Sequence, residues 1–360
     1  MVNTKQFNYL NLSVEQRIIA VQRLTALWAF CESGLGGLLH VLQIPFTGLI
    51  IGGLAVINIT LITKFSENRS SQLFQSLLVV LTVKAMVSPY SPFPAYIAVS
   101  FQALLGFVLY RLFQVNLLSL LLLGIITMLE SAVQKLLLLT LFFGTSFWKA
   151  IDDMMAYITT QMGFSAKIGS QWAITVYLLI YVAGGILVAG MTYKIIKSFS
   201  FNNKNEVPVN GDFFNYKINI PVVGKSKNIR KKILLMILAL LIVSILLFVF
   251  AADAKQGWVA VLKTVCWTLS AIMIWYLLIG PLFTRLILRA LQKKAGRYSE
   301  SISRTLSFLP VLRPLTTLAW QKSKDYNGWN RMYYFFITLV CWSLVYSELP
   351  DSKQSLNSPV

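Results

Sequence analysis

The chain has few charged side chains and very few of the residue types that build metal or disulfide sites. Only 12% of its 360 residues are charged, and it contains one histidine and three cysteines. A soluble domain usually carries about twice that charged fraction. Cys31, Cys266 and Cys341 form no C-x-x-C pair and have no neighbouring histidine, so neither a disulfide framework nor a zinc site is indicated.

Signature motifs of several enzyme classes are also missing. No G-x-x-x-x-G-K-[S/T] sequence occurs, so the chain cannot itself be a P-loop ATPase, and there is no G-x-S-x-G. Asp152 and Asp153 form a single acid pair, whereas an isoprenoid diphosphate site needs paired acid clusters to hold magnesium. One histidine does not supply the ligands of a metalloprotease. We predict no catalytic residue, no metal and no cofactor.

Long apolar runs are what the sequence has in excess. Hydrophobic residues make up 56% of the chain and the mean hydropathy is +0.67. Apolar runs of about 18 or more residues recur along its whole length, which is typical of a multi-pass, all-α membrane protein. The segment before the first run is polar and no A-x-A-like site follows it, so we expect no cleavable signal peptide. The nine predicted transmembrane spans are 19–43, 44–65, 71–88, 93–113, 115–143, 170–198, 231–252, 258–284 and 330–347.

Basic residues alternate between the two ends of these spans. They concentrate in 194–232 and 285–331, whereas the loops at 145–169 and 253–257 carry acids. The positive-inside rule then predicts a cytosolic N-terminus, an external C-terminus and insertion in the cell (inner) membrane. This distribution explains the net charge of +19 without nucleic acid, and it places the basic loops where they can contact anionic lipids.

The spans divide into two blocks. Residues 1–199 hold six spans, 200–229 form a polar cytosolic linker, and 230–360 hold three spans. The last block includes a basic cytosolic segment, 285–329, whose helix we expect Pro310 and Pro314 to break. This segment either lies on the inner leaflet or contacts a cytosolic partner or lipid. Its predicted contact residues are Arg289, Lys293, Lys294, Arg297 and Arg304.

Ionisable residues within the membrane mark candidate functional positions, because burying a charge there is costly. The predicted orientation places those of the first block at or above the membrane midplane, on the outer side. Glu32, Gly36 and His40 share one helical face, and Glu130 to Lys135 contribute another. We predict an outward-facing pocket for a solute. Its candidate binding residues are Glu32, His40, Lys84, Glu130, Gln134, Lys135 and Tyr96.

Other interpretations of these residues remain open. Glu32 with Lys84, or Glu130 with Lys135, could form structural ion pairs, while His40 could lie at headgroup level. A proton or ion relay is a third possibility. Beside the polar face, Ala29, Ser33 and Gly37 form a small-xxx-small stripe that predicts close helix packing or subunit docking.

Two outer segments could cover such a pocket. The proline-rich stretch 87–96 predicts a rigid extended loop from which Tyr90, Phe93 and Tyr96 project, although it could equally be a simple helix terminator. Residues 145–165 show helical apolar spacing with a polar edge, which predicts an amphipathic helix on the outer surface that could act as a lid.

Six short-looped spans, the glycine-rich stretch GLGGLLHVLQIPFTGLIIGG (34–53) and the proline-rich outer loop resemble the substrate-binding S component of energy-coupling factor (ECF) transporters, over residues 14–199. The resemblance implies a six-helix protein that binds a vitamin or micronutrient. It also implies docking on a T component through small residues of the first helix, where this chain has Ala29, Ser33 and Gly37. The C-terminal block, 229–348, resembles a T component, with Ala295-Gly296-Arg297 standing for an Ala-Arg-Gly motif.

The sequence therefore favours a membrane component of a solute-uptake transporter. Because the chain lacks a P-loop, ATP-driven transport would require ATPase subunits and a T component as partners. The alternatives are a membrane-embedded enzyme acting on a lipid or isoprenoid substrate, and a non-catalytic membrane scaffold subunit.

Overall fold

The computed structural model describes most of the first block and part of the second. The described residues are 13–41, 46–67, 70–88, 91, 93–161, 169–200 and 296–345, with isolated positions between 265 and 289. Within these ranges every regular element is a helix, so the all-α prediction is confirmed. The predicted linker from 201 on, the span 231–252 and most of the span 258–284 lie outside the described residues.

The helices match the predicted spans closely. The first span is a continuous helical rod made of α1 (Val14–Phe30), the π-helical turn η2 (Cys31–Leu35) and α2 (Gly36–Val41). A capping box between Ser13 and Gln16 begins it. The later helices are α3 (Thr47–Phe65), α4 (Ser70–Val87), α5 (Phe93–Phe113), α6 (Leu117–Phe143), α7 (Thr145–Gln161), α8 (Ser170–Ser200), α12 (Ser299–Lys322) and α13 (Gly328–Val345).

Four of these helices, α3, α5, α6 and α8, are long and apolar enough to cross a membrane. A membrane-spanning helix needs about 20 predominantly apolar residues. The protein is therefore a membrane protein whose described part is all-helical. The predicted spans 19–43, 71–88 and 330–347 also form helices, but these fall outside that group of four.

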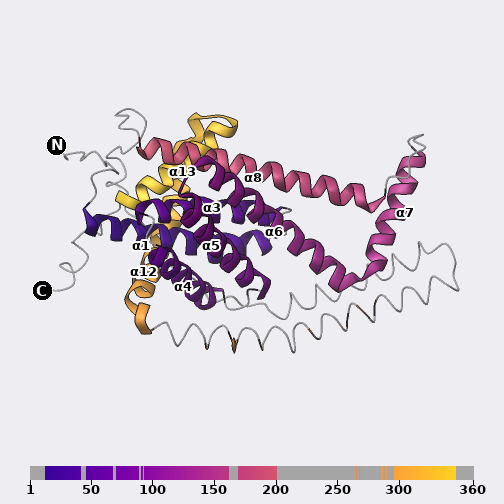
Figure 1. Cartoon of the computed structure of the whole chain (residues 1–360), viewed down its shortest axis with the longest axis horizontal. Helices are drawn as coiled ribbons and strands as arrows, with labels where there is room; N and C mark the ends of the chain where they lie inside the picture. The colour runs from indigo at the N-terminus through magenta and orange to yellow at the C-terminus, as the bar shows by residue number, and fades with distance from the viewer. Residues whose placement is uncertain are drawn as a thin grey trace, which may run out of the picture.

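The bundle is held together by close approach of small residues. At the crossing of α6 and α8, a Cβ built on Gly124 would lie 2.6 Å from the carbonyl oxygen of Gly185, and one on Gly185 would lie 2.7 Å from Cα of Ile125. Such contacts let two backbones meet where lipid offers no hydrophobic drive for packing. Beyond this crossing α6 and α8 diverge, and α7 joins their far ends away from the bundle (Figure 1).

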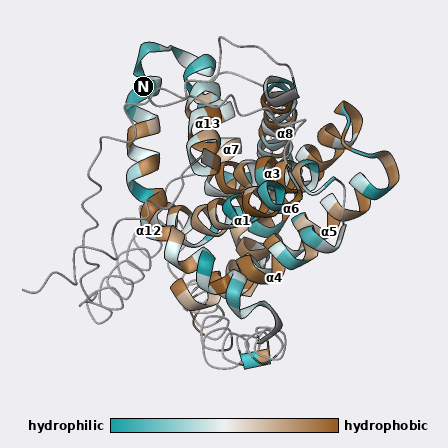
Figure 2. Ribbon diagram, turned by 90° about the vertical axis from the view of Figure 1, so that its left-hand side faces the viewer, coloured by the Kyte–Doolittle hydropathy of each residue, from teal (hydrophilic) through white to brown (hydrophobic). Residues whose placement is uncertain are grey.

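Helices α12 and α13 pack against the end of the bundle where α1 and α4 begin and α8 ends. The guanidinium of Arg23 lies 4.0 Å from the ring centroid of Phe308 on α12. Figure 2 shows that α12 mixes hydrophilic and hydrophobic residues, whereas apolar residues dominate the bundle helices. The C-terminal block thus contacts the first block directly in its described part.

The expected break in the basic segment is wrong, because α12 is continuous through Pro310 and Pro314. Proline removes one backbone hydrogen bond, which disfavours a helix in isolation. Here Phe308, Leu312 and Leu315 are buried on both sides of the two prolines. Packing of this apolar face against the bundle therefore overrides the local cost.

Candidate functional site: a buried polar cluster

An ion pair lies inside the helix bundle. Nζ of Lys84 on α4 donates to Oε2 of Glu32 in η2 at 2.8 Å, and the two residues are only 4% and 5% exposed. Removing both ions from water costs several kcal/mol each, and their mutual attraction offsets this cost. The pairing of these two charges is one of the arrangements that the sequence left open.

Glu32 lies in a π-helical turn. In η2 the N–H of Gly36 donates to the carbonyl of Cys31, five residues earlier, so this turn holds more residues than an α-helical one. The extra residue changes the helical phase of all later residues in the rod. The shared face predicted for Glu32, Gly36 and His40 stays a prediction, because the side chain of His40 lies outside the described residues. Short π-helical turns occur frequently at functional sites.

Two further polar side chains extend the cluster across α5 and α6. The side chains of Gln102 on α5 and Glu130 on α6 are hydrogen-bonded to each other, and the Glu130 carboxyl also interacts electrostatically with that of Glu32. Gln102 is 3% exposed. We name Glu32, Lys84, Gln102 and Glu130 the polar cluster.

The polar cluster contains two acceptors that no donor reaches. Oε1 of Gln102 and Oε2 of Glu130 are buried and have no hydrogen-bond partner among the described residues. Leaving a buried acceptor unsatisfied costs about 1–3 kcal/mol, and more for a charged group. Trp28, Asn58 and Thr127 also carry an unpaired buried atom, so an unpaired atom alone does not mark a site. What distinguishes the cluster is that Glu130 interacts both with Gln102 and with Glu32, which is itself paired with Lys84.

Sequence reasoning missed Gln102. Its signal was available, since it is a glutamine in the apolar run FQALLGF at 101–107, within a predicted span. Gln102 was not among the predicted residues, because ionisable groups were used to find them and an amide carries no charge. Buried amides nevertheless require partners as strictly as charges do.

The other predicted residues on α6 lie apart from the cluster. Nε2 of Gln134 donates to the carbonyl of Pro94 at 2.9 Å, which ties α6 to the start of α5. Lys135 is exposed. The carboxyl of Glu130 faces Gln102 and Glu32, so no Glu130–Lys135 ion pair is present among the described residues.

The expected extended loop at 87–96 is wrong at its C-terminal end. Phe93 begins α5, and Pro94 lies in its first turn, where proline is well tolerated because that N–H has no helical partner. Tyr96 is therefore helical and 4% exposed, packed in the core rather than projecting. Pro89, Tyr90 and Pro92 lie outside the described residues. His40 lies on α2, and its side chain is outside the described part.

The small-residue stripe is partly buried. Ala29 and Ser33 are buried, and the Ser33 hydroxyl donates to the Ala29 carbonyl one turn earlier. A Cβ on Gly37 would meet nothing within 4 Å, so no described residue approaches closely there. Docking of another subunit on this stripe stays a prediction.

The predicted basic contact residues are only partly described. Arg304 is exposed on α12, pairs with Glu300 and donates to Oε1 of Gln22 on α1 at 3.3 Å. Arg289 is at an exposed helical position, and the side chain of Arg297 is not described. Lys293 and Lys294 lie outside the described residues. Contact of this set with lipid or a partner stays a prediction.

No group of three His, Cys, Asp or Glu side chains in the described part of the chain is placed to hold a metal ion. Fold and cluster together define a multi-pass helical membrane protein with charged and amide side chains joined inside its bundle. Comparison with family models, curated proteins and solved structures gives no match. Function is therefore argued from the cluster itself.

Proposed function

We propose that this protein is the membrane component of a solute-uptake transporter and that the polar cluster binds a small polar solute. The observation that carries the proposal is the pair of unpaired acceptors, Oε1 of Gln102 and Oε2 of Glu130, next to a buried ion pair. Polar and ionisable side chains inside a membrane protein are costly to keep and commonly mark substrate or ion pathways.

The chemistry of the cluster selects the solute. Both unpaired groups are acceptors, so a complementary solute must present hydrogen-bond donors. Glu32 and Lys84 neutralise each other, which leaves Glu130 without a cation of its own in the described part of the cluster. A solute with an ammonium group, alone or in a zwitterion, supplies both the donors and the missing charge. A purely anionic solute would meet two acceptors and an acid.

Energy coupling would come from other subunits. The chain has no nucleotide-binding loop, so the proposal includes ATPase subunits and a T component, as its resemblance to ECF S components implies. The external C-terminus and the inner membrane belong to the same proposal. Co-purification of ATPase subunits with the tagged protein from its own membranes would support it.

Native mass spectrometry of the purified protein tests the binding site. We expect wild type to retain a small amine-bearing molecule that Glu130→Gln and Gln102→Leu both lose. Two exposed positions, Glu15→Gln and Gln161→Leu, are matched controls and should retain it. The molecule identified is then assayed for uptake into vesicles. If all five proteins retain the same molecules and transport them equally, the cluster is not a solute site.

A further inference from the structure

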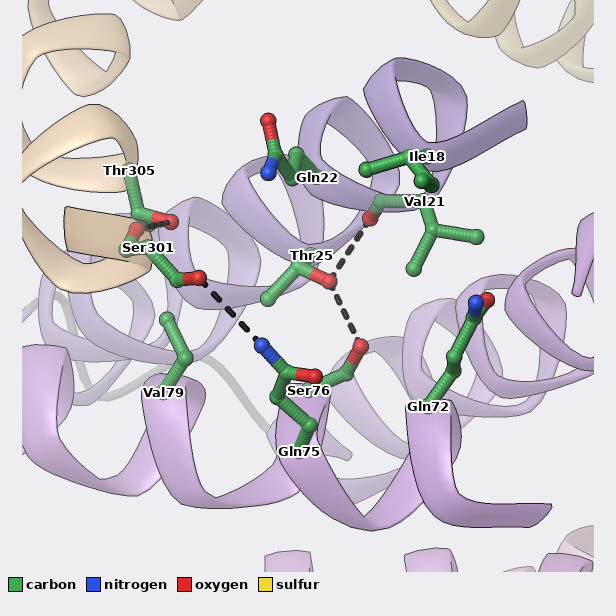
Figure 3. A pocket seen from close by; sticks show the side chains of 10 residues that line it. All are labelled: Ile18, Val21, Gln22, Thr25, Gln72, Gln75, Ser76, Val79, Ser301 and Thr305. Carbon is green, nitrogen blue, oxygen red and sulfur yellow. Dashed lines mark hydrogen bonds between the residues drawn. The ribbon is translucent and has the colours of Figure 1, made fainter. Parts of the chain in front are cut away.

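A cavity of about 180 Å³ lies between α1, α4 and α12 (Figure 3). It opens beside the N-terminal halves of α1 and α4. Thr25 in its wall is two helical turns, about 10 Å, from Glu32 along the same helix. The cavity is thus separate from the polar cluster, and a ligand bound there is independent of the proposed transport function.

Much of the cavity lining is polar but uncharged. Gln22 comes from α1, and Gln72 and Gln75 come from α4, with the Gln72 amide directed toward α1 (Figure 3). Each glutamine amide offers both donors and an acceptor. Among the described residues that line the cavity there is no acid and no base. Arg304 of α12, which donates to Gln22, is itself paired with Glu300.

The hydroxyl groups of the same lining are held by one another. Oγ1 of Thr25 donates to Oγ of Ser76 at 2.7 Å, and Nε2 of Gln75 donates to Oγ of Ser301 at 3.3 Å (Figure 3). The second bond joins α4 to α12 across the cavity. Its length leaves it weak, so a ligand group could replace it at little cost.

Aliphatic side chains complete the lining: Ile18 and Val21 of α1 lie on the side of Gln72, and Val79 of α4 lies at the other end of the cavity (Figure 3). An apolar cavity of about 150 Å³ accommodates one benzene ring. The volume here therefore fits a single ring lying against Ile18 and Val21, with a polar edge turned toward the neighbouring Gln72 amide (Figure 3). A charged ligand would lose its hydration without gaining a counter-ion.

We propose that this cavity binds a neutral single-ring molecule with an amide or lactam edge. Such an edge presents a donor beside an acceptor, which a glutamine amide can pair with through two hydrogen bonds, as amide side chains do with base edges. The bound molecule contacts α1, α4 and α12 together. Occupancy therefore also fastens α12 to the bundle.

Saturation-transfer NMR on the purified full chain in detergent tests this with benzamide as the probe, and with benzoate and toluene as comparators. We expect benzamide to bind at least about tenfold more tightly than either comparator, since benzoate adds a charge and toluene lacks the polar edge. Equal binding of all three would overturn the assignment of ligand class, and no benzamide binding would overturn the site.

Two variants locate the binding. Ser301→Leu fills the cavity and should weaken benzamide binding at least tenfold, while Ser303→Leu on the exposed side of α12 should not change it. Gln72→Leu keeps the side chain's size but removes its amide, and it should weaken benzamide binding without affecting toluene. Gln321→Leu, at an exposed position, is its control. Equal benzamide affinity in wild type, Ser301→Leu and Gln72→Leu would place the probe elsewhere and refute the proposal.

Discussion

Replacing either partner of the buried ion pair alone should destabilise the protein far more than replacing both. Nζ of Lys84 and Oε2 of Glu32 are 2.8 Å apart. Their Coulomb attraction is about 6 kcal/mol at an effective dielectric constant of about 20. The cost of desolvating the two ions is of similar size, so the pair as a whole contributes little net stability. Either ion left alone keeps its desolvation cost and loses the attraction.

We therefore expect Glu32→Met and Lys84→Met each to lower the free energy of unfolding by about 3–5 kcal/mol. The double variant should lie within about 1 kcal/mol of wild type, or above it, because two methionines fill the space without charge. Lys149→Met and Glu15→Met, both at exposed positions, should change the free energy by less than about 0.5 kcal/mol.

Reversible unfolding by SDS in mixed micelles, monitored by circular dichroism, measures all five variants on one scale. The double-mutant cycle should give a coupling energy of several kcal/mol. If the double variant is as unstable as the sum of the two single variants, the two charges do not compensate each other and the reasoning fails. Binding is a separate readout, because a stable double variant has lost the charges that the proposed solute site contains.

The remaining predictions concern helix packing, a helix cap and topology. Gly124→Ala should destabilise the protein by about 1–3 kcal/mol in the same SDS assay, because its Cβ would press on the backbone of α8; Gly190→Ala, which meets nothing within 4 Å, should be neutral or stabilising. The backbone N–H of Ser170, the first residue of α8, donates to Asp152 and holds the pKa of that carboxyl below its usual range. The ionised carboxylate therefore stabilises the start of α8 above about pH 4, and this stabilisation is lost as the pH falls further. Asp152→Ala, which removes the acceptor, should show faster amide exchange in the first turn of α8 at pH 7, and wild type alone should lose protection on acidification; equal exchange at pH 7 would contradict the cap. In a cysteine-free background, Lys149→Cys should react with an impermeant maleimide on intact cells and Glu15→Cys only after lysis, whereas the reverse pattern would invert the predicted orientation.

The helices were predictable because their boundaries depend on local signals. Apolar length, the capping box at Ser13 and the glycine after α6 are all read within a few neighbouring residues. The span predicted at 93–113 coincides with α5, and that predicted at 44–65 ends with α3. Local pattern was therefore sufficient to place the elements in the described part of the chain.

Features that depend on tertiary contacts could not be read in the same way. The π-helical turn at Glu32 adds one residue to a turn without any compositional signature, so the sequence could not predict it. The continuity of α12 through Pro310 depends on its packing against α1 and α4. The pairing of Glu32 with Lys84 was one of several arrangements that sequence spacing allowed, and only the relative placement of two helices selects among them.

Polar groups within the bundle fall into two kinds, and the difference bears on function. Thr63, Thr192 and Ser343 each donate to the carbonyl one turn earlier, so their hydroxyls need no tertiary partner. Gln102 and Glu130 instead carry buried acceptors, Oε1 and Oε2, that have no hydrogen-bond partner among the described residues. A bundle selected for stability alone would place leucine at both positions, since an apolar residue there costs no desolvation. Keeping two acceptors unpaired beside a neutralised ion pair is expected of a site that receives its donors from a bound molecule.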